Sequence, residues 1–434
     1  MNKVKQIFGG DTRQLGMIIA LVALLLFFQI WSGGLIITPN NFNNIIQGNA
    51  YILVLAVGMV LVIIAGHIDL SVGSVAAFVG IVVATAIQNW GLPWYLALVL
   101  GLVVGAVAGA WQGFWVSIVG IPAFIVTLAG MLFFRGANQF VGKSNSVTVP
   151  SDFIQIGAGT LPEVGPSTGY NNLTILLGVV ACVGIIIGSI RGRAKLVRIG
   201  ATVEDAWITW TRLTLICAVI FGVMLLFASG TKGFPYSGLI LVALVLIYGF
   251  ISNRTITGRH IYAVGGNKNA AELSGVKSRR INFLVMMNMS VLAALAGMMF
   301  VARSTASGPF DGTGWELDAI AAVFIGGAAV TGGVGTVVGS VVGGLVIAVL
   351  NNGLQIESIG ADATQMIKGL VLLAAVAFDV YNKRQGKPSI TGLLLRGARG
   401  GRGGGTDDPQ DPTSVPPSAK TETARTSETI GQSG

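Results

Sequence analysis

The sequence is poor in the residues on which soluble proteins and most enzymes depend. Only 10% of its 434 residues are charged, whereas soluble domains carry roughly 25%. Apolar residues make up 53% of the chain, and a soluble protein of this length could not remove so much apolar surface from water. The composition therefore excludes an ordinary soluble domain and indicates a protein whose solvent is the lipid bilayer.

Cysteine and histidine are nearly absent. Cys182 and Cys217 both lie within apolar runs, so at most one bridge can form, and we interpret both as small core residues. The two histidines, His67 and His260, are too far apart in the sequence to suggest a metal site. Because no nucleophile stands beside a general base, we expect no enzymatic activity, no metal and no cofactor in this chain.

Long apolar segments dominate the chain. A membrane-crossing helix needs about 20 mostly apolar residues, or fewer where it is broken or tilted. We predict an all-α polytopic membrane protein with about 10–12 transmembrane helices, some short or re-entrant, and an uncleaved first span. Segments 50–65 and 317–330 are candidates for half-helices. The twelve candidate segments are residues 15–37, 50–65, 72–88, 93–117, 119–134, 173–190, 213–229, 236–251, 281–302, 317–330, 335–352 and 366–381.

Basic residues separate these segments unevenly. A formal charge of +9 would suggest a nucleic-acid partner in a soluble protein, but here lysine and arginine cluster between apolar segments and should set orientation in the membrane. We therefore expect lipid and no nucleic acid as a partner. Residues 1–14, 191–212 and 252–280 should be cytoplasmic, as should a polar, disordered tail over 386–434. The outer loops would be 38–49, 135–172, 230–235, 303–316 and 353–365.

Two apolar segments carry a glycine at every fourth position, a pattern that favours close helix contact in lipid. Packing within the chain is the simpler interpretation, and a seam between two copies is the alternative. The glycines are Gly101, Gly105 and Gly109 in one segment and Gly335, Gly339 and Gly343 in the other.

Residues 66–74 place polar groups between two short apolar segments. An ionised side chain at mid-bilayer costs about 2.5–3.5 kcal/mol on insertion scales, so His67 and Asp69 should not face lipid. The residues could line a polar path at a break between half-helices. They could equally form a cytoplasmic turn in which Asp69 or Ser71 is the N-cap of the next helix.

Three further features carry polar groups. In the basic loop, Asn267 to Leu273 suits a short surface helix flanked by glycines, although a solvated linker is the alternative. Glu316 and Asp318 stand at the mouth of a glycine-rich apolar hairpin, where they could anchor it at the outer surface or contact a substrate or outer partner. Asn351 and Asn352 near the end of an apolar helix could be gate residues or a C-terminal cap.

These motifs resemble a known family. Residues 66–74 resemble the Gly-Ile-Asp-Leu-Ser-Val-Gly-Ser signature of bacterial ribose, xylose and galactose ABC-transporter permeases. Residues 122–130, 258–276 and 316–322 resemble further shared stretches. Residues 368–383 are most similar to the multiple-monosaccharide permease subgroup, near the xylose permeases. The resemblance covers about residues 15–385 and departs from the shorter ribose permeases over about 140–235, as an inserted helix pair would.

The resemblance implies a machine in the bacterial inner membrane, with both termini of this chain cytoplasmic. Two permease chains form the pore as a homodimer, and an ATPase with two nucleotide-binding halves, which holds ATP and Mg, docks on the cytoplasmic loops. A periplasmic or lipid-anchored sugar-binding protein delivers the sugar. By position, the resemblance assigns a pathway role to His67, Asp69, Ser71 and Ser74, and ATPase coupling to Gly265, Asn267, Ala270, Ala271, Ser274 and Gly275.

The resemblance thus predicts a permease subunit that moves monosaccharides into the cytoplasm and is powered by a separate ATPase. One alternative is the same machine with another cargo, such as a branched-chain amino acid or a signalling furanone. Another is an ion-coupled sugar carrier, which would place paired ionisable residues in mid-membrane. In the sequence only His67 and Asp69 come close to that pattern.

Overall fold

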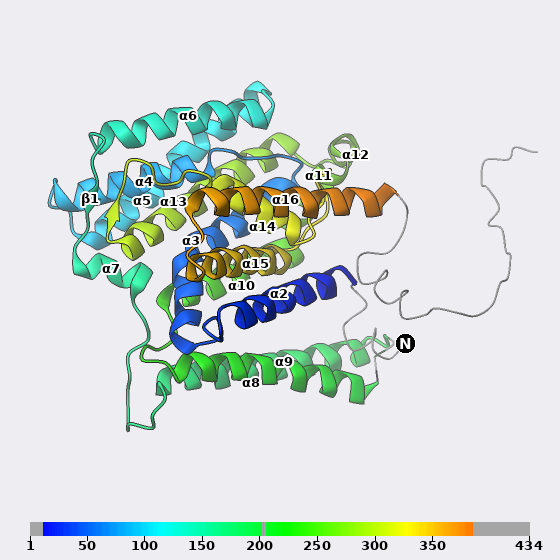
Figure 1. Ribbon diagram of the computed structural model, residues 1–434. Coiled ribbons are helices and arrows are strands. Elements are labelled where there is room, and N and C mark those ends of the chain that lie inside the picture. Colours follow the sequence, from blue (N-terminus) through cyan, green and yellow to red (C-terminus); the bar gives the residue numbers. More distant parts are fainter. Residues whose placement is uncertain (1–11, 202, 204, 385–434) are drawn as a thin grey trace, which may run out of the picture. The chain divides into compact units, whose positions relative to one another are not determined.

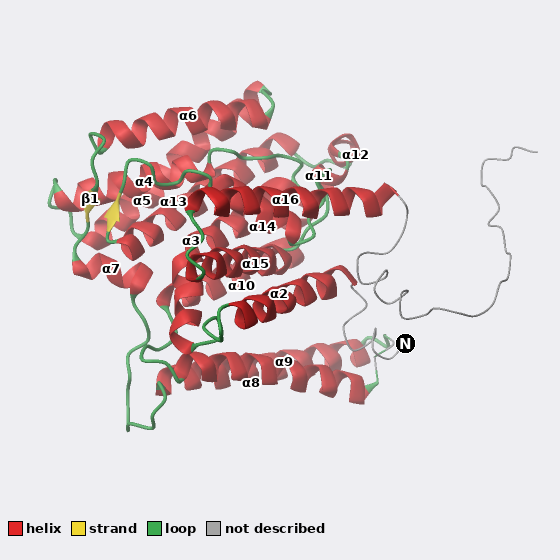
Figure 2. Ribbon diagram, in the orientation of Figure 1, coloured by secondary structure: helices red, strands yellow, loops and turns green. Residues whose placement is uncertain are grey.

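The computed structural model describes residues 12–201, 203 and 205–384, which are almost entirely helical (Figures 1 and 2). Within this part, the paired strands are β1 (Val147–Thr148) and β2 (Ala306–Ser307), which run antiparallel. The predicted tail 386–434 and most of the predicted cytoplasmic N-terminus lie outside the described residues. The helices are α2 (Thr12–Trp31), α3 (Pro39–Ile64), α4 (Val72–Gln88), α5 (Trp94–Phe114), η1 (Trp115–Val119), α6 (Ala123–Val141), α7 (Ser151–Ala158), α8 (Asn172–Arg198), α9 (Ala206–Ala228), α10 (Tyr236–Arg254), α11 (Ile256–Gly266), α12 (Lys268–Leu273), α13 (Ser278–Ser304), α14 (Trp315–Ile325), α15 (Val337–Ile356) and α16 (Ala361–Arg384).

Every predicted apolar segment coincides with a helix, which confirms a polytopic all-α membrane protein. Within the described residues, eight helices are long and apolar enough to cross a bilayer, and two shorter apolar helices add to them. Segment 317–330 is indeed short, because α14 has 11 residues. The half-helix prediction for 50–65 is wrong: the preceding residues, predicted as a loop, form the first three turns of the 26-residue α3. The polar side chains in those turns hid the helix from a search for apolar runs.

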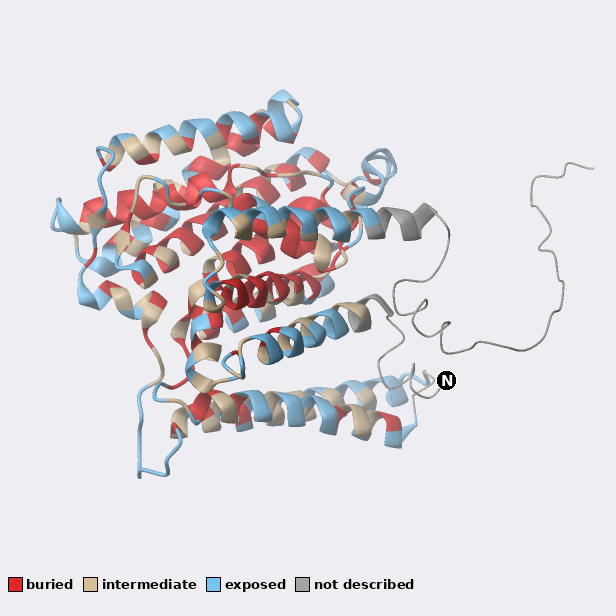
Figure 3. Cartoon of the chain, viewed as in Figure 1, coloured by how far each residue is buried: buried red, intermediate tan, exposed pale blue. Residues whose placement is uncertain are grey.

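A tightly packed bundle surrounds α3 and α13. The most extensive contacts of α13 are with α5, α3 and α4, while α14 and α15 pack on each other and on α3. Burial is concentrated there (Figure 3): 83% of the most apolar stretch of α3 is buried. Because the side chains on all faces of this stretch meet protein, residues 51–64 are apolar all round rather than amphipathic.

The glycine stripes pack within the chain, which confirms the simpler interpretation. On α5, a Cβ added at Gly105 would lie 2.5 Å from Ala294 Cβ of α13. On α15, a Cβ added at Gly343 would lie 2.0 Å from the carbonyl oxygen of Ala322 on α14. Backbones approach so closely only where no side chain stands between them.

Helices α8 and α9 form a separate hairpin. They lie side by side at the lower edge of Figure 1, and α9 also contacts α3. Only 11% and 22% of the most apolar stretches of α8 and α9 are buried. Residues 191–198, predicted as part of a cytoplasmic loop, continue α8 to its end. The hairpin therefore depends on its surroundings, rather than on the bundle, to cover its apolar side chains.

Candidate functional site

A polar pocket of about 800 Å³ lies where the first turns of α3 meet the last turns of α15 and the start of α16. Its volume is in the range of small-molecule sites, about 300–1,000 Å³. We call it the asparagine pocket because amide side chains dominate its wall. Those amides belong to Asn41, Asn44, Asn49, Asn351, Asn352, Gln355 and Gln365.

Pairs of asparagines tie α3 to α15 across this pocket. Asn41 Nδ2 donates to Asn352 Oδ1 at 2.8 Å, and Asn352 Nδ2 donates back to Asn41 Oδ1 at 3.0 Å. Asn351 Nδ2 donates to Asn49 Oδ1 at 3.2 Å. The C-terminal-cap interpretation of Asn351 and Asn352 is wrong, because α15 continues to Ile356.

Charged and aromatic groups complete the wall. Lys368 Nζ on α16 lies 2.9 Å from each carboxylate oxygen of Asp318 on α14, so the two helices are joined by an ion pair. The rings of Tyr51 and Trp315 lie against each other with centroids 4.2 Å apart. The pocket thus offers donors, acceptors and an aromatic surface.

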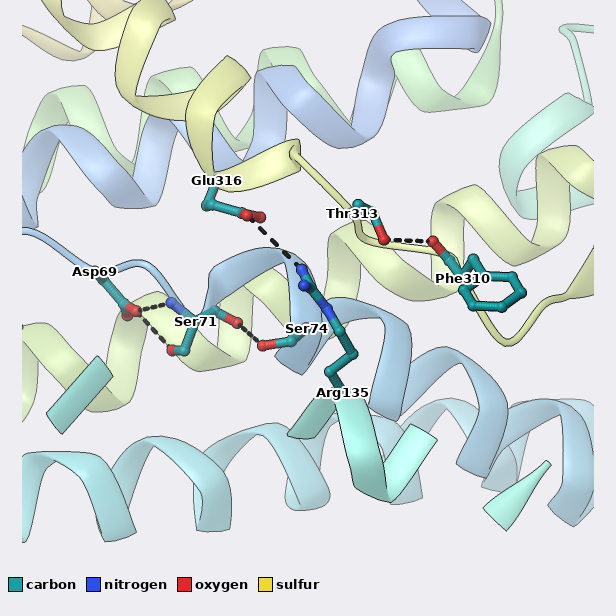
Figure 4. Close-up of polar contacts among 7 residues, drawn as sticks. All are labelled: Asp69, Ser71, Ser74, Arg135, Phe310, Thr313 and Glu316. Carbon is teal, nitrogen blue, oxygen red and sulfur yellow. Dashed lines mark hydrogen bonds and ion pairs between the residues drawn. The ribbon is translucent and has the colours of Figure 1, made fainter. Parts of the chain in front are cut away.

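Glu316 and Asp318, the two carboxylates at the start of the hairpin, are each only 6% exposed. Glu316 Oε1 lies 3.9 Å from Arg135 Nη2 of α6 (Figure 4). A Cβ added at Gly73 would lie 2.6 Å from Glu316 Oε2 and 2.2 Å from Gly312 O. Glycine at position 73 therefore allows α4 to abut the beginning of α14.

Residues 65–71 form the turn that connects α3 to α4, and residues 72–74 begin α4. Asp69 is fully buried, and its Oδ1 accepts from Ser71 N at 2.8 Å and from Ser71 Oγ at 2.6 Å (Figure 4). Gln112 of α5 donates to Ser71 Oγ at 2.7 Å, and Ser74 Oγ donates to Ser71 O at 2.8 Å. Burial raises the pKa of Asp69 to about 6, although the bonds from Ser71 oppose the shift. Ser71 is the N-cap of α4 without a side-chain capping bond, so the carboxylate orders the turn itself.

The same turn borders a second cavity, of about 630 Å³, which we call the turn cavity. Gly66, His67 and Ile68 line one side, and Lys268 of α12 and Arg279 of α13 line another. Burial lowers the pKa of His67, which favours its neutral form. The turn cavity therefore joins the predicted pathway motif to the predicted coupling motif.

The predicted surface helix is present as α12, and Asn267 is its N-cap, with Oδ1 accepting from Ala270 N at 3.0 Å. Ala271 is buried, whereas Ala270, Ser274 and Gly275 are exposed. The preceding helix α11 presses on the end of α3: a Cβ added at Gly265 would lie 1.6 Å from Ile64 O. A surface helix thus reaches the bundle through a backbone contact.

The loop between α14 and α15 also touches this point. Gly333 N donates to Ile64 O at 2.8 Å, and Tyr262 Oη of α11 donates to Gly335 O at 2.7 Å. The end of α3, the α11–α12 segment and the α14–α15 loop therefore form one contact, which we call the α3 junction (Ile64, Tyr262, Gly265, Gly333 and Gly335).

The structure divides the predicted site residues into two sets. His67, Asp69 and the α11–α12 residues gather near the α3 junction, whereas Asn351 and Asn352 lie at the asparagine pocket. Helix α3 reaches both places, and its 26 residues span about 39 Å. A single rigid element therefore connects a ligand-sized pocket to a surface helix.

Sequence reasoning missed several of these residues. The predicted outer loops 38–49 and 135–172 contain Asn41, Asn49 and Arg135, and Lys368 lies in a predicted apolar segment with no role assigned to its charge. A search for polar residues at helical spacing could have found Asn41 and Asn44, which are three positions apart.

Comparison with protein families identifies one match. The family described as branched-chain amino acid transport system / permease component matches residues 41–376. This range begins at the asparagine pocket and ends within α16.

Individual relatives match this chain over most of its length. The xylose transport system permease protein XylH of Haemophilus influenzae is 35% identical over 85% of this chain and 96% of its own length. XylH of Escherichia coli K12 is 37% identical over 85% of this chain and 92% of its own. The ribose import permease protein RbsC of Escherichia coli K12 is 32% identical over 84% of this chain and 94% of its own length. No solved structure matched the chain.

Proposed function

The chain belongs to the branched-chain amino acid transport system / permease component family, and from that premise we propose that it is the membrane subunit of a monosaccharide importer. It would move sugars of the xylose, glucose, galactose or arabinose type into the cytoplasm. A separate ATP-binding-cassette ATPase would supply the energy. Two copies of this chain would form the pore, with both termini in the cytoplasm.

The asparagine pocket carries the proposal. An amide both donates and accepts hydrogen bonds, as a sugar hydroxyl does, so a wall of amides suits a neutral polyhydroxylated ligand. The paired amides of Asn41 and Asn352 can exchange bonds with each other for bonds with a sugar at little net cost. Names of the relatives, which refer to xylose and ribose, support the same substrate class.

Coupling to the ATPase would run through the α3 junction. We assign the motor contact to the surface around α12, with Gly265, Asn267, Ala270, Ala271, Ser274 and Gly275 as its residues. A push on α12 would reach Ile64 through the close approach of Gly265, and α3 would transmit it to the asparagine pocket. A periplasmic or lipid-anchored binding protein would deliver sugar at the pocket end.

Two other functions each have one observation in their favour. The family description names branched-chain amino acids, and the Asp318–Lys368 pair could bind an amino acid's ammonium and carboxylate groups. The same pair resembles the buried ionisable pairs of ion-coupled carriers. Both alternatives depend on the ion pair, whereas the sugar proposal depends on the amides.

Reconstitution separates these functions. Proteoliposomes would contain this chain with a partner ATPase and a secreted sugar-binding protein, and uptake of labelled xylose and labelled leucine would be compared. We expect xylose uptake that requires ATP and is lost in Asn352→Leu. Leucine uptake, or uptake driven by an ion gradient without the ATPase, would overturn the proposal.

Asn267→Arg tests the coupling assignment. Loss of the N-cap bond costs about 1 kcal/mol and frays a helix of only six residues. We expect normal insertion in the membrane but no ATP-driven uptake, while Asn267→Asp, which keeps a capping oxygen, retains most of the activity. Full uptake in the arginine variant would remove α12 from the mechanism.

A further inference from the structure

The end of the α8–α9 hairpin, away from the asparagine pocket and the α3 junction, contains an unassigned groove. Its volume is about 470 Å³. The wall is mostly aliphatic, with one aromatic ring and one guanidinium group. The lining residues are Ser189, Ile190, Arg193, Ala194, Val197, Thr209, Trp210 and Leu213.

A basic stripe runs beside this groove. Arg191, Lys195 and Arg198 are all exposed and recur at intervals of four and three along α8, so they share one helix face. Ile190, Ala194 and Val197 recur at the same intervals and line the groove on the adjacent face. A positively charged edge therefore borders an apolar groove along the last two turns of α8.

Aromatic and hydrogen-bonding groups from α9 close the other side. Trp210 lines the groove and is 54% exposed, as expected for a ring at the boundary between lipid and water. Arg193 Nη1 donates to Thr209 Oγ1 at 3.0 Å and joins the two helices at the groove. This hydrogen bond joins the two walls of the groove, and its two residues form the polar part of the lining.

Simpler explanations account for the charges but not for the groove. Lys195 and Arg198 lie in the last turn of α8, where cations favour the negative end of the helix dipole. Basic residues also set membrane orientation. Neither effect requires an apolar groove beside the charges or a second helix that supplies tryptophan.

We propose that this groove binds one anionic phospholipid of the bilayer, with its phosphate diester at the stripe of Arg191, Lys195 and Arg198 and an acyl chain in the groove. An anionic phospholipid has a negative headgroup that suits the basic stripe and an apolar acyl chain that suits the groove. The exposure of the hairpin places bilayer lipid against it already. A second copy of this chain would bring one basic stripe against another and is disfavoured by charge.

The test is lipid binding to the full-length chain, purified in a mild detergent and measured by native mass spectrometry. We expect phosphatidylglycerol to remain bound when phosphatidylcholine is lost. The triple variant Arg191→Gln, Lys195→Gln, Arg198→Gln should weaken that binding about 150-fold, because each of the three basic residues contributes about 1 kcal/mol near an anionic lipid. This readout is independent of transport, so it can fail while the importer proposal stands.

Matched variants keep the proposal falsifiable. Arg254→Gln, Arg259→Gln, Arg280→Gln removes the same charge from exposed positions outside the groove and should leave phosphatidylglycerol binding unchanged. Ala194→Trp fills the groove, keeps every charge and should lower binding at least tenfold. Equal loss in both triple variants, full binding in Ala194→Trp, or displacement of the lipid by millimolar glycerol phosphate would overturn the proposal. Each variant's thermal melting is measured beside binding to confirm that it is folded.

Discussion

Gly297 in the α3–α13 bundle and two glycines of α8 in the α8–α9 hairpin occupy opposite environments. In the bundle, a Cβ added at Gly297 of α13 would lie 2.0 Å from Ala76 O of α4. In the hairpin, a Cβ added at Gly184 or Gly188 of α8 would meet nothing within 4 Å. Glycine thus allows close backbone contact at Gly297 in the bundle, whereas at Gly184 and Gly188 in the hairpin no neighbouring atom requires it.

The difference separates a part in which neighbouring backbones touch from a part whose apolar side chains are exposed. In the bundle, atoms on neighbouring backbones touch, so a displacement of one helix must displace the next. In the hairpin, exposed side chains meet the bilayer, whose acyl chains adapt to any shape. A substitution that adds volume should therefore be severe in the bundle and mild in the hairpin.

Gly297→Val should have the largest effect. Its side chain would overlap the backbone of α4, which cannot move without disturbing α13 and α3, so destabilisation should reach about 3 kcal/mol or more. We expect loss of monodisperse protein in size-exclusion chromatography in detergent and a lower melting temperature. A stable variant with wild-type melting would show that the bundle is looser than these contacts indicate.

Lys368→Met should have the second largest effect on stability. It leaves the Asp318 carboxylate buried without its cation, and breaking such a pair costs about 3 kcal/mol. The double variant Lys368→Met, Asp318→Leu should recover most of the melting temperature, because it removes the stranded charge as well. If xylose uptake also recovers in the double variant, the ion pair supports the fold only, whereas persistent loss of uptake would place it in the transport cycle.

Gly265→Ala should impair coupling. The added methyl group would lie 1.6 Å from Ile64 O and 2.9 Å from Gly333 N, so α11 would have to move away from the end of α3, which also lowers stability. Gly266→Ala is the matched control, since nothing lies within 4 Å of its added Cβ. We expect ATP-driven uptake to fall at least tenfold in the first variant and to remain normal in the second. Equal activity of the two would show that force does not pass through Ile64.

The sequence alone predicted the class of the fold because apolar length and basic loops are local properties. All twelve apolar segments became helices, and the glycine stripes packed as the spacing of Gly105 and Gly343 indicated. The asparagine pocket was not predictable in this way, because Asn41 and Asn352 are 311 positions apart and meet only after the bundle has formed. Burial of Glu316 was missed for a related reason, since its partner Arg135 is on a distant helix that resembles an ordinary span.

Gly184→Val in the hairpin should have the smallest effect. Valine and glycine differ by only about 0.4 kcal/mol in helix propensity, in favour of valine, and the new side chain would extend into open space. Melting temperature and xylose uptake should both match those of the unmodified chain, in contrast to the same substitution at Gly297. If Gly184→Val instead impaired assembly as severely as Gly297→Val, a protein surface rather than lipid would have to cover this face of α8. The hairpin would then belong to an interface, and its mild response to substitution could no longer be attributed to the bilayer.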